Sequence, residues 1–204
     1  MFTNNAHPSS HAIVIGGSVA GMTTAQVLPR YFERITIIER DSLPATPEFR
    51  KGAPHARHAH ILLGRGQEIL EGLFPGLRQA LIEQGAVNVN MGNELVLFNS
   101  GAWGQPFPSA INMIGCSRPL LEHTMRGLLL RNPQVQLFQE QEVLGLLGDE
   151  KGQRAIGIRL RDRHQPDAAE STLYADLVVD ASGRSSHAPQ WLEELGYVAP
   201  VETT

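Results

Sequence analysis

Cysteine is almost missing from this chain of 204 residues, which contains one, Cys116. A single cysteine excludes an internal disulfide and suits a reducing compartment, so we expect a cytoplasmic protein. Apolar runs all fall short of the roughly 18 residues that a membrane-spanning helix needs, and the polar residues 1–11 hold no apolar core of a signal peptide. An excess of basic residues is missing too: the net charge is −4, which argues against nucleic acid as a partner.

What the chain does contain is a glycine turn between an apolar strand and a helix. Residues 12–21 read Ala-Ile-Val-Ile-Gly-Gly-Ser-Val-Ala-Gly, and a second apolar run ends at Glu39-Arg40. In a dinucleotide site Gly16 permits the sharp turn, Gly17 and Ser18 leave room for a pyrophosphate, and Gly21 lets the helix pack close to the strand. The helix start, with Val19 and Ala20, supplies N–H donors to the phosphates. Glu39, about twenty residues on, is placed to accept from ribose hydroxyls.

This motif departs from the usual Gly-x-Gly-x-x-Gly pattern, because Ser18 stands at the middle glycine. The alternative is a glycine-bearing strand–helix turn in some other α/β protein. The order of strand, turn, helix and acid favours the dinucleotide interpretation. An acid at position 39 disfavours a ribose with a 2′-phosphate, and these residues leave NAD and FAD both open.

Hydrophobic periodicity and turn residues predict the elements. We expect helices at 18–30, 66–84 (interrupted near Pro75), 118–130 and 189–195. We expect strands at 12–16, 35–39, 60–63, 94–98, 135–138, 142–147, 155–161 and 172–179, with a proline-rich loop over 41–56 and a turn-rich stretch over 101–109.

These pieces in this order resemble the FAD-dependent oxidoreductases of the para-hydroxybenzoate hydroxylase group, above all its bacterial FAD-dependent monooxygenases or hydroxylases. The resemblance covers nearly the whole chain. It rests on Val-Ile-Gly-Gly-Ser-Val-Ala-Gly (14–21), Glu39-Arg40-Asp41, the segment 57–63 with Arg65-Gly66, Cys116-Ser117-Arg118-Pro119-Leu120-Leu121-Glu122, and Asp176-Leu177-Val178-Val179-Asp180-Ala181-Ser182-Gly183-Arg184.

The resemblance implies FAD as the cofactor and a role for each matching residue. Gly16, Gly17, Ser18 and Gly21 would hold the pyrophosphate, and Glu39 with Arg40 the adenosine ribose. Arg57 would face the phosphates or the ribityl chain, Arg118 would reach the pyrophosphate, and the backbone of Val143 would approach the adenine. Asp180, Ser182 and Gly183 match a second cofactor signature, in which Ser182 replaces the aspartate of the commoner Gly-x-Asp-Gly.

The fold expected from this resemblance is α/β. It is an FAD-binding, Rossmann-like parallel sheet of the glutathione-reductase type, with a small antiparallel β-meander near 135–179 and part of a substrate-domain sheet near 94–114. We expect a flexible tail over 1–10, an FAD-binding βαβ core over 11–92, partial substrate-domain strands over 93–115, and a return to the FAD-binding domain over 116–204.

The function that the resemblance implies is hydroxylation of a small organic substrate by FAD, with O₂ and with NAD(P)H as reductant. Family members are about twice as long and carry a later Gly-Asp-Ala signature that nothing here matches, so we expect an N-terminal half. The alternatives are a remnant that binds FAD without turnover, a subunit whose C-terminal half is a separate chain, and a flavin-dependent polyprenyl reductase or halogenase.

Two other groups of residues could carry chemistry. His55, His58 and His60 lie close in sequence, but no carboxylate or cysteine stands beside them at ligand spacing, so we expect no metal site. Ser185, Ser186 and His187 lack the Gly-x-Ser-x-Gly pattern of a nucleophile turn. We name no catalytic acid or base, since the flavin carries the reaction.

Overall fold

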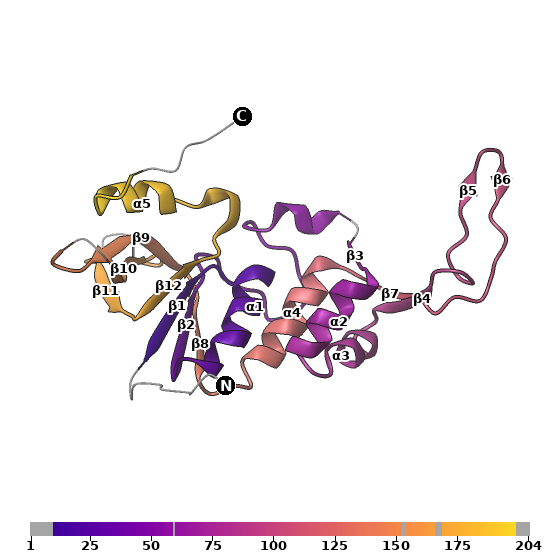
Figure 1. The fold of residues 1–204 in the computed structure, drawn as a ribbon, viewed down its shortest axis with the longest axis horizontal. Helices are drawn as coiled ribbons and strands as arrows, with labels where there is room; N and C mark the ends of the chain where they lie inside the picture. Colours follow the sequence, from indigo (N-terminus) through magenta and orange to yellow (C-terminus); the bar gives the residue numbers. More distant parts are fainter. Residues whose placement is uncertain (1–9, 59, 152–153, 166–168, 199–204) are drawn as a thin grey trace. The chain divides into compact units, whose positions relative to one another are not determined.

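The computed structural model describes residues 10–58, 60–151, 154–165 and 169–198, so residues 1–9, most of the expected tail, lie outside the described part. The chain divides into two compact units (Figure 1). Unit 1 comprises Met1–Leu43 and Leu129–Thr204, and unit 2 comprises Pro44–Leu128. The segment 93–115, expected to hold substrate-domain strands, lies inside unit 2.

Unit 1 is built on a parallel sheet in the order β12-β1-β2-β8. The strands are β1 (His11–Ile15), β2 (Arg34–Ile38), β8 (Val135–Phe138) and β12 (Leu177–Asp180), and the helix α1 (Val19–Val27) with a 3₁₀ turn (Leu28–Arg30) connects β1 to β2. Ile15 is paired with Ile38 on one side and with Asp180 on the other. The residues that follow these three positions therefore meet at one edge of the sheet, and the expected α/β fold with a parallel sheet is confirmed.

The two faces of this sheet are covered by different elements. Ile13, Ile15 and Ile38 pack with Ile158, Leu160 and Trp191 in one buried cluster. These last three belong to a meander and to α5 (Ala188–Glu194), which therefore cover this face. Successive strand residues point to opposite faces, and α1 covers the other face with its buried residues, Gly21, Met22 and Ala25.

The meander is smaller than the sequence suggested. It contains β9 (Gln141–Gly148), β10 (Ala155–Asp162) and β11 (Ser171–Tyr174), whereas β8 belongs to the parallel sheet. The expected single strand over 172–179 is wrong, because the chain changes sheets within it. The Ala175 N–H still bonds the Ile156 carbonyl of the meander, but the Asp176 N–H bonds the His11 carbonyl and its carboxylate accepts from the His11 N–H at 2.9 Å. Asp176 thereby starts β12 beside β1.

Unit 2 contains an antiparallel sheet in the order β3-β7-β4, formed by β3 (His60–Leu62), β7 (Asn112–Cys116) and β4 (Val87–Asn90). Two helices follow β3, α2 (Gly64–Leu73) and α3 (Leu77–Glu83), and their separation at Pro75 confirms the expected interruption. The helix α4 (Arg118–Leu129) also agrees with its prediction and buries Leu120, Leu121 and Met125.

The strand expected at 94–98 is wrong. Asn90 and Glu94 close a turn there, since the Glu94 N–H bonds the Asn90 carbonyl and the Glu94 carboxylate accepts from the Asn90 N–H. Beyond it, β5 (Phe98–Asn99) and β6 (Ala102–Trp103) form a short hairpin. The antiparallel sheet of unit 2 contains β4 instead. The sequence of β4, Val-Asn-Val-Asn, has too little apolar character to be predicted as a strand.

His11 is a buried histidine at the start of β1. Its Nδ1 lies 2.7 Å from the Tyr174 carbonyl oxygen and its Nε2 lies 2.8 Å from the Thr36 hydroxyl oxygen. The Tyr174 carbonyl only accepts, whereas Arg34 Nη2, which lies 3.1 Å from the same Nδ1, only donates, so this nitrogen stands between an acceptor and a donor. Burial lowers the pKa of His11, and the nearby Arg34 acts in the same direction.

This lowered pKa predicts a stability that falls in acid. The unfolded chain takes up a proton on His11 near pH 6.5 while the folded chain resists it, so the free energy of unfolding should decrease as the pH drops through about 6.5. Urea unfolding between about pH 5.5 and 7.5 should show this slope, and His11→Gln should flatten it. An equal slope in the His11 variant would contradict the assignment.

Candidate functional site

The glycine turn (Gly16–Gly21) is held against a second turn of unit 1. Gly16 has a φ of +105°, and its N–H donates to the Ile38 carbonyl at 2.8 Å. A Cβ on Gly16 would lie 2.6 Å from the carbonyl oxygen of Ala181, in the turn after β12. The sequence predicted a tight turn at Gly16, but the contact with Ala181 joins residues too distant in sequence to be foreseen.

Helix α1 begins in direct contact with this turn. A Cβ on Gly21 would lie 1.8 Å from the Gly16 carbonyl oxygen. The first bond of the helix runs from the Met22 N–H to the Ser18 carbonyl at 2.9 Å, so the amides of Val19, Ala20 and Gly21 precede it. The first turn also carries no acidic side chain. These amides and the positive end of the helix dipole make the turn suitable for an anion.

Glu39 is fixed by the backbone of the glycine turn. The residue is 5% exposed, and its Oε2 accepts from the Gly17 N–H at 2.8 Å. Its Oε1 accepts from the Asp41 N–H at 2.9 Å. Each carboxylate oxygen accepts more than one hydrogen bond, so the group is oriented by two amides and still suits a diol. The sequence predicts that Glu39 lies at the ribose, but it does not show which backbone donors orient the carboxylate.

Two further predicted residues lie near Glu39 in unit 1. Arg40 is exposed, and its carbonyl accepts from Arg163 Nη1 at 2.8 Å. Val143 is half-buried in β9 and packs against the Ile158 cluster. Because β9 pairs with β10 alone within the meander, it is an edge strand. The side chain of Val143 thus packs against the core, and only the backbone of Val143 lies at the edge of the sheet.

The turn after β12 is closed by Asp180. One of its carboxylate oxygens accepts from the Ser182 N–H at 2.8 Å, and the other accepts from the Ser186 hydroxyl. Gly183 adopts a φ of +77°, a conformation that glycine takes readily. The Ala181 N–H bonds the Ile15 carbonyl. Asp180 therefore shapes the second turn, in which Ala181 lies against Gly16.

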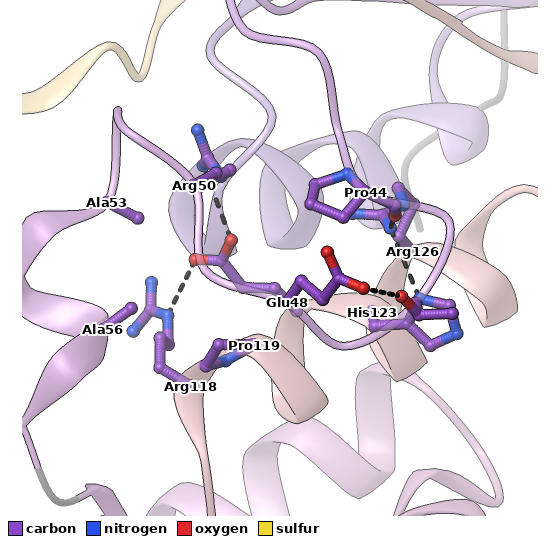
Figure 2. Close-up of a pocket in the computed structure, with 11 residues that line it drawn as sticks. Pro44, Glu48, Arg50, Ala53, Ala56, Arg118, Pro119, His123 and Arg126 are labelled. Carbon is purple, nitrogen blue, oxygen red and sulfur yellow. Dashed lines mark hydrogen bonds and ion pairs between the residues drawn. The ribbon is translucent and has the colours of Figure 1, made fainter.

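Arg118 opens α4 in unit 2 and is paired with the helix itself. Its Nε donates to Glu122 Oε1 at 2.7 Å, and Glu122 Oε2 lies 3.4 Å from Arg50 Nη2. In Figure 2 the dashed lines from the labelled Arg50 and Arg118 end on the same carboxylate, which carries no label and is that of Glu122. Sequence reasoning named Arg118 but missed Arg50 and Glu122, although the spacing of four residues between Arg118 and Glu122 is typical of a helical ion pair.

Further positive charge lines the same pocket. Arg126 Nη2 donates to the Pro44 carbonyl, and burial lowers the pKa of Arg126, with Arg50 acting in the same direction and Glu122 opposing it. Burial and the charge of Arg126 also lower the pKa of His123. Three guanidiniums line this pocket with two carboxylates, the buried one of Glu122 and the exposed one of Glu48, and the remaining positive charge favours an additional anion.

Arg57 lies in the 3₁₀ turn η2 (Pro54–Arg57) of unit 2, and its guanidinium carbon stands 5.1 Å from the centre of the Phe49 ring, a cation–π geometry. Close by, His60 Nδ1 bonds the His58 carbonyl at 2.8 Å. Among the residues described, no three side chains of the metal-binding types gather at one place. Within the same residues, no helix is long and apolar enough to cross a membrane.

The residues of the glycine turn fit a dinucleotide. Added Cβ atoms at Gly16 and Gly21 would collide with backbone, a Cβ at Gly17 would come within 3.1 Å of Glu39, and the helix amides face the same turn. A pyrophosphate needs that close approach to backbone N–H groups, and a ribose needs the fixed acceptor.

Comparison with known proteins agrees with this geometry. The family described as FAD binding domain matches residues 9–195. The chain therefore belongs to the FAD binding domain family, and its cofactor is FAD. The resemblance to the FAD-dependent oxidoreductases of the para-hydroxybenzoate hydroxylase group is thereby confirmed.

The relatives and solved structures that match this chain are longer than it is. Protein Rv3254 of Mycobacterium tuberculosis (strain ATCC 25618 / H37Rv) is 33% identical over 204 residues, which cover 97% of this chain and 43% of that protein. The structure of the myxobacterial FAD-dependent halogenase CndH has a TM-score of 0.63 at 22% identity, covering 88% of this chain and 39% of that one. The structure of the flavin-dependent monooxygenase PieE, in complex with FAD and substrate, has a TM-score of 0.61 at 22% identity. The match covers 92% of this chain and 32% of PieE. The chain thus shares the fold of CndH and PieE, and it spans less than half the length of each of the three proteins.

Proposed function

We propose that this chain is the FAD-binding part of a flavin-dependent monooxygenase that hydroxylates a small organic substrate, with NAD(P)H as reductant. The observation that carries the proposal is the glycine turn, where helix amides and the oriented carboxylate of Glu39 meet beside the turn at Asp180. The monooxygenase PieE shares this fold.

Each site residue has a proposed task toward FAD. The glycine turn binds the pyrophosphate, Glu39 and Arg40 bind the adenosine ribose, and the backbone of Val143 meets the adenine. Arg118 and Arg57 of unit 2 contribute positive charge to the phosphates or the ribityl chain. Asp180, Ser182 and Gly183, which form the second cofactor signature, also bind FAD.

When bound, FAD would supply the redox chemistry of the reaction, in which NAD(P)H is the reductant, one atom of O₂ enters the substrate and the other becomes water. The residues of this chain bind and orient. Because the chain spans 43% of Rv3254, we propose that substrate- and ring-binding residues come from a C-terminal half, including the case in which that half is a separate chain. We place the protein in the cytoplasm, where a single cysteine stays reduced.

Halogenation is the second candidate, and the fold shared with CndH supports it. Isotopic oxygen separates the two. This chain, combined with the proposed C-terminal half, is supplied with FAD, NADH or NADPH, bromide, ¹⁸O₂ and a panel of phenolic compounds. A monooxygenase transfers one ¹⁸O atom to the organic product, whereas a brominated product without ¹⁸O would replace the proposal by the halogenase.

Cofactor selectivity gives the direct test of the site. Calorimetric titration of the purified chain should show FAD binding more tightly than ADP, and ADP more tightly than NAD. FAD, ADP and NAD all bring a pyrophosphate and an adenosine ribose to the glycine turn. FAD alone adds a ribityl chain, which Arg57 is proposed to meet, whereas the nicotinamide ribose of NAD has no proposed partner in this chain. Tighter binding of NAD than of FAD would refute the assignment.

A further inference from the structure

Glu122 is a buried carboxylate that joins two separate segments of unit 2. Its side chain is 7% exposed, and those of Arg50 and Arg118 are 9% and 17% exposed. Arg118 comes from the start of α4, whereas Arg50 comes from the loop between Pro44 and Ala53 (Figure 2). One side chain therefore determines where two guanidiniums lie.

The burial of this cluster separates it from ordinary surface pairs. An exposed pair such as Arg65 with Glu68, whose side chains are 80% and 68% exposed, has little energetic weight. In a buried cluster, removal of one partner leaves a charge without compensation. The Glu122 carboxylate is therefore a strong constraint on both arginines.

The geometry of the pair also fixes the plane of Arg118. A guanidinium is planar with five N–H donors, so a bond through Nε determines the direction in which the whole fork faces. A cation in the first turn of a helix is unfavourable to the helix dipole. An anionic ligand would explain the position of Arg118. The pocket has positive charge left for such a ligand, because Arg50, Arg118 and Arg126 outnumber its two carboxylates, Glu122 and Glu48.

We propose that Glu122 is a positioning residue for the pyrophosphate of the cofactor: by bonding Arg118 and Arg50 together, it holds the Arg118 guanidinium in the orientation that meets phosphate oxygens. The inference rests on the proposed role of Arg118. Glu122 does not touch the phosphates, because two anions repel; it acts through Arg118.

The test compares ligands that differ in their phosphates. The full chain carrying Glu122→Gln is titrated by calorimetry with ADP and with adenosine. We expect about tenfold weaker binding of ADP and less than about twofold change for adenosine. A role limited to folding would weaken both ligands alike. The exposed pair supplies a matched control, since Glu68→Gln removes the same charge from the same unit and should change neither affinity.

A double-mutant cycle shows whether Glu122 acts through Arg118. Arg118→Ala alone should weaken ADP binding, and adding Glu122→Gln to that variant should cause no further loss. An equal further loss would overturn the proposal. If Glu122→Gln fails to fold by circular dichroism, Glu122→Asp keeps the charge but shortens the side chain by one methylene. It should show the same selective loss of ADP in smaller measure, and an unchanged affinity for ADP would overturn the proposal.

The outcomes separate this inference from the proposed function. If the unsubstituted chain binds FAD and ADP and Glu122→Gln leaves ADP affinity unchanged, the positioning role fails and the cofactor site stands. If the unsubstituted chain binds neither FAD nor ADP, the proposed function fails and the positioning role fails with it.

Discussion

Gly21→Ala should weaken FAD binding by about 100-fold and lower the free energy of unfolding by about 3 kcal/mol. The added methyl group would stand 1.8 Å from the Gly16 carbonyl oxygen, a backbone atom that cannot rotate away. Either α1 or the glycine turn must then move, and a shift of about 1 Å at such a site can reduce binding and catalysis by about 100-fold. The same displacement separates α1 from the sheet face that Met22 and Ala25 cover, which explains the loss of stability.

Flavin fluorescence titration and urea unfolding would measure the two effects of Gly21→Ala. The matched control is Gly127→Ala, because Gly127 is an exposed helical glycine of α4 at which a Cβ would meet no atom within 4 Å. That variant should gain about 0.5–1 kcal/mol through helix propensity and keep its FAD affinity. Native FAD affinity in the Gly21 variant would remove the glycine turn from the site.

The parallel sheet could be predicted because its signals are local. The runs 12–15 and 35–38 are apolar throughout and are followed by a glycine turn and an acid, and α4 shows a clear helical period. The sheet change within 172–179 had no such signal. It depends on Asp176 bonding His11, 165 residues earlier in the chain. β4 was not predicted because its alternating asparagines are typical of a loop.

The site shows the same division between local and distant information. The motif placed Gly16, Gly21 and Glu39 together through short-range spacing, and the structure brings them together in unit 1. The contact of Gly16 with Ala181 and the sharing of Glu122 by Arg50 and Arg118 join segments far apart in sequence. The periodicity of apolar residues along the chain does not indicate which of these distant segments will be in contact. The roles of all these residues toward the cofactor, and those of Arg40, Arg57 and Val143, stay predictions.

Glu39→Gln should weaken FAD binding by about 50-fold and cost about 2 kcal/mol of folding stability. The carboxylate accepts from the Gly17 N–H through one oxygen and from the Asp41 N–H through the other. A glutamine has only one acceptor oxygen, so its amide group must face one of these N–H donors, and two donors then oppose each other at a buried position. The negative charge that strengthens hydrogen bonds from ribose hydroxyls is lost as well.

Adenosine distinguishes this effect of Glu39→Gln from a general loss of fold, because it carries the ribose without phosphates. Calorimetry should show FAD and adenosine weakened by similar factors in Glu39→Gln, whereas Glu122→Gln should spare adenosine. The control lies at the other end of the same strand: Glu33 is exposed, and Glu33→Gln should change neither affinity nor unfolding. Unchanged adenosine binding in Glu39→Gln would show that the ribose is held elsewhere, and the carboxylate would then serve only to shape the turn at Gly17.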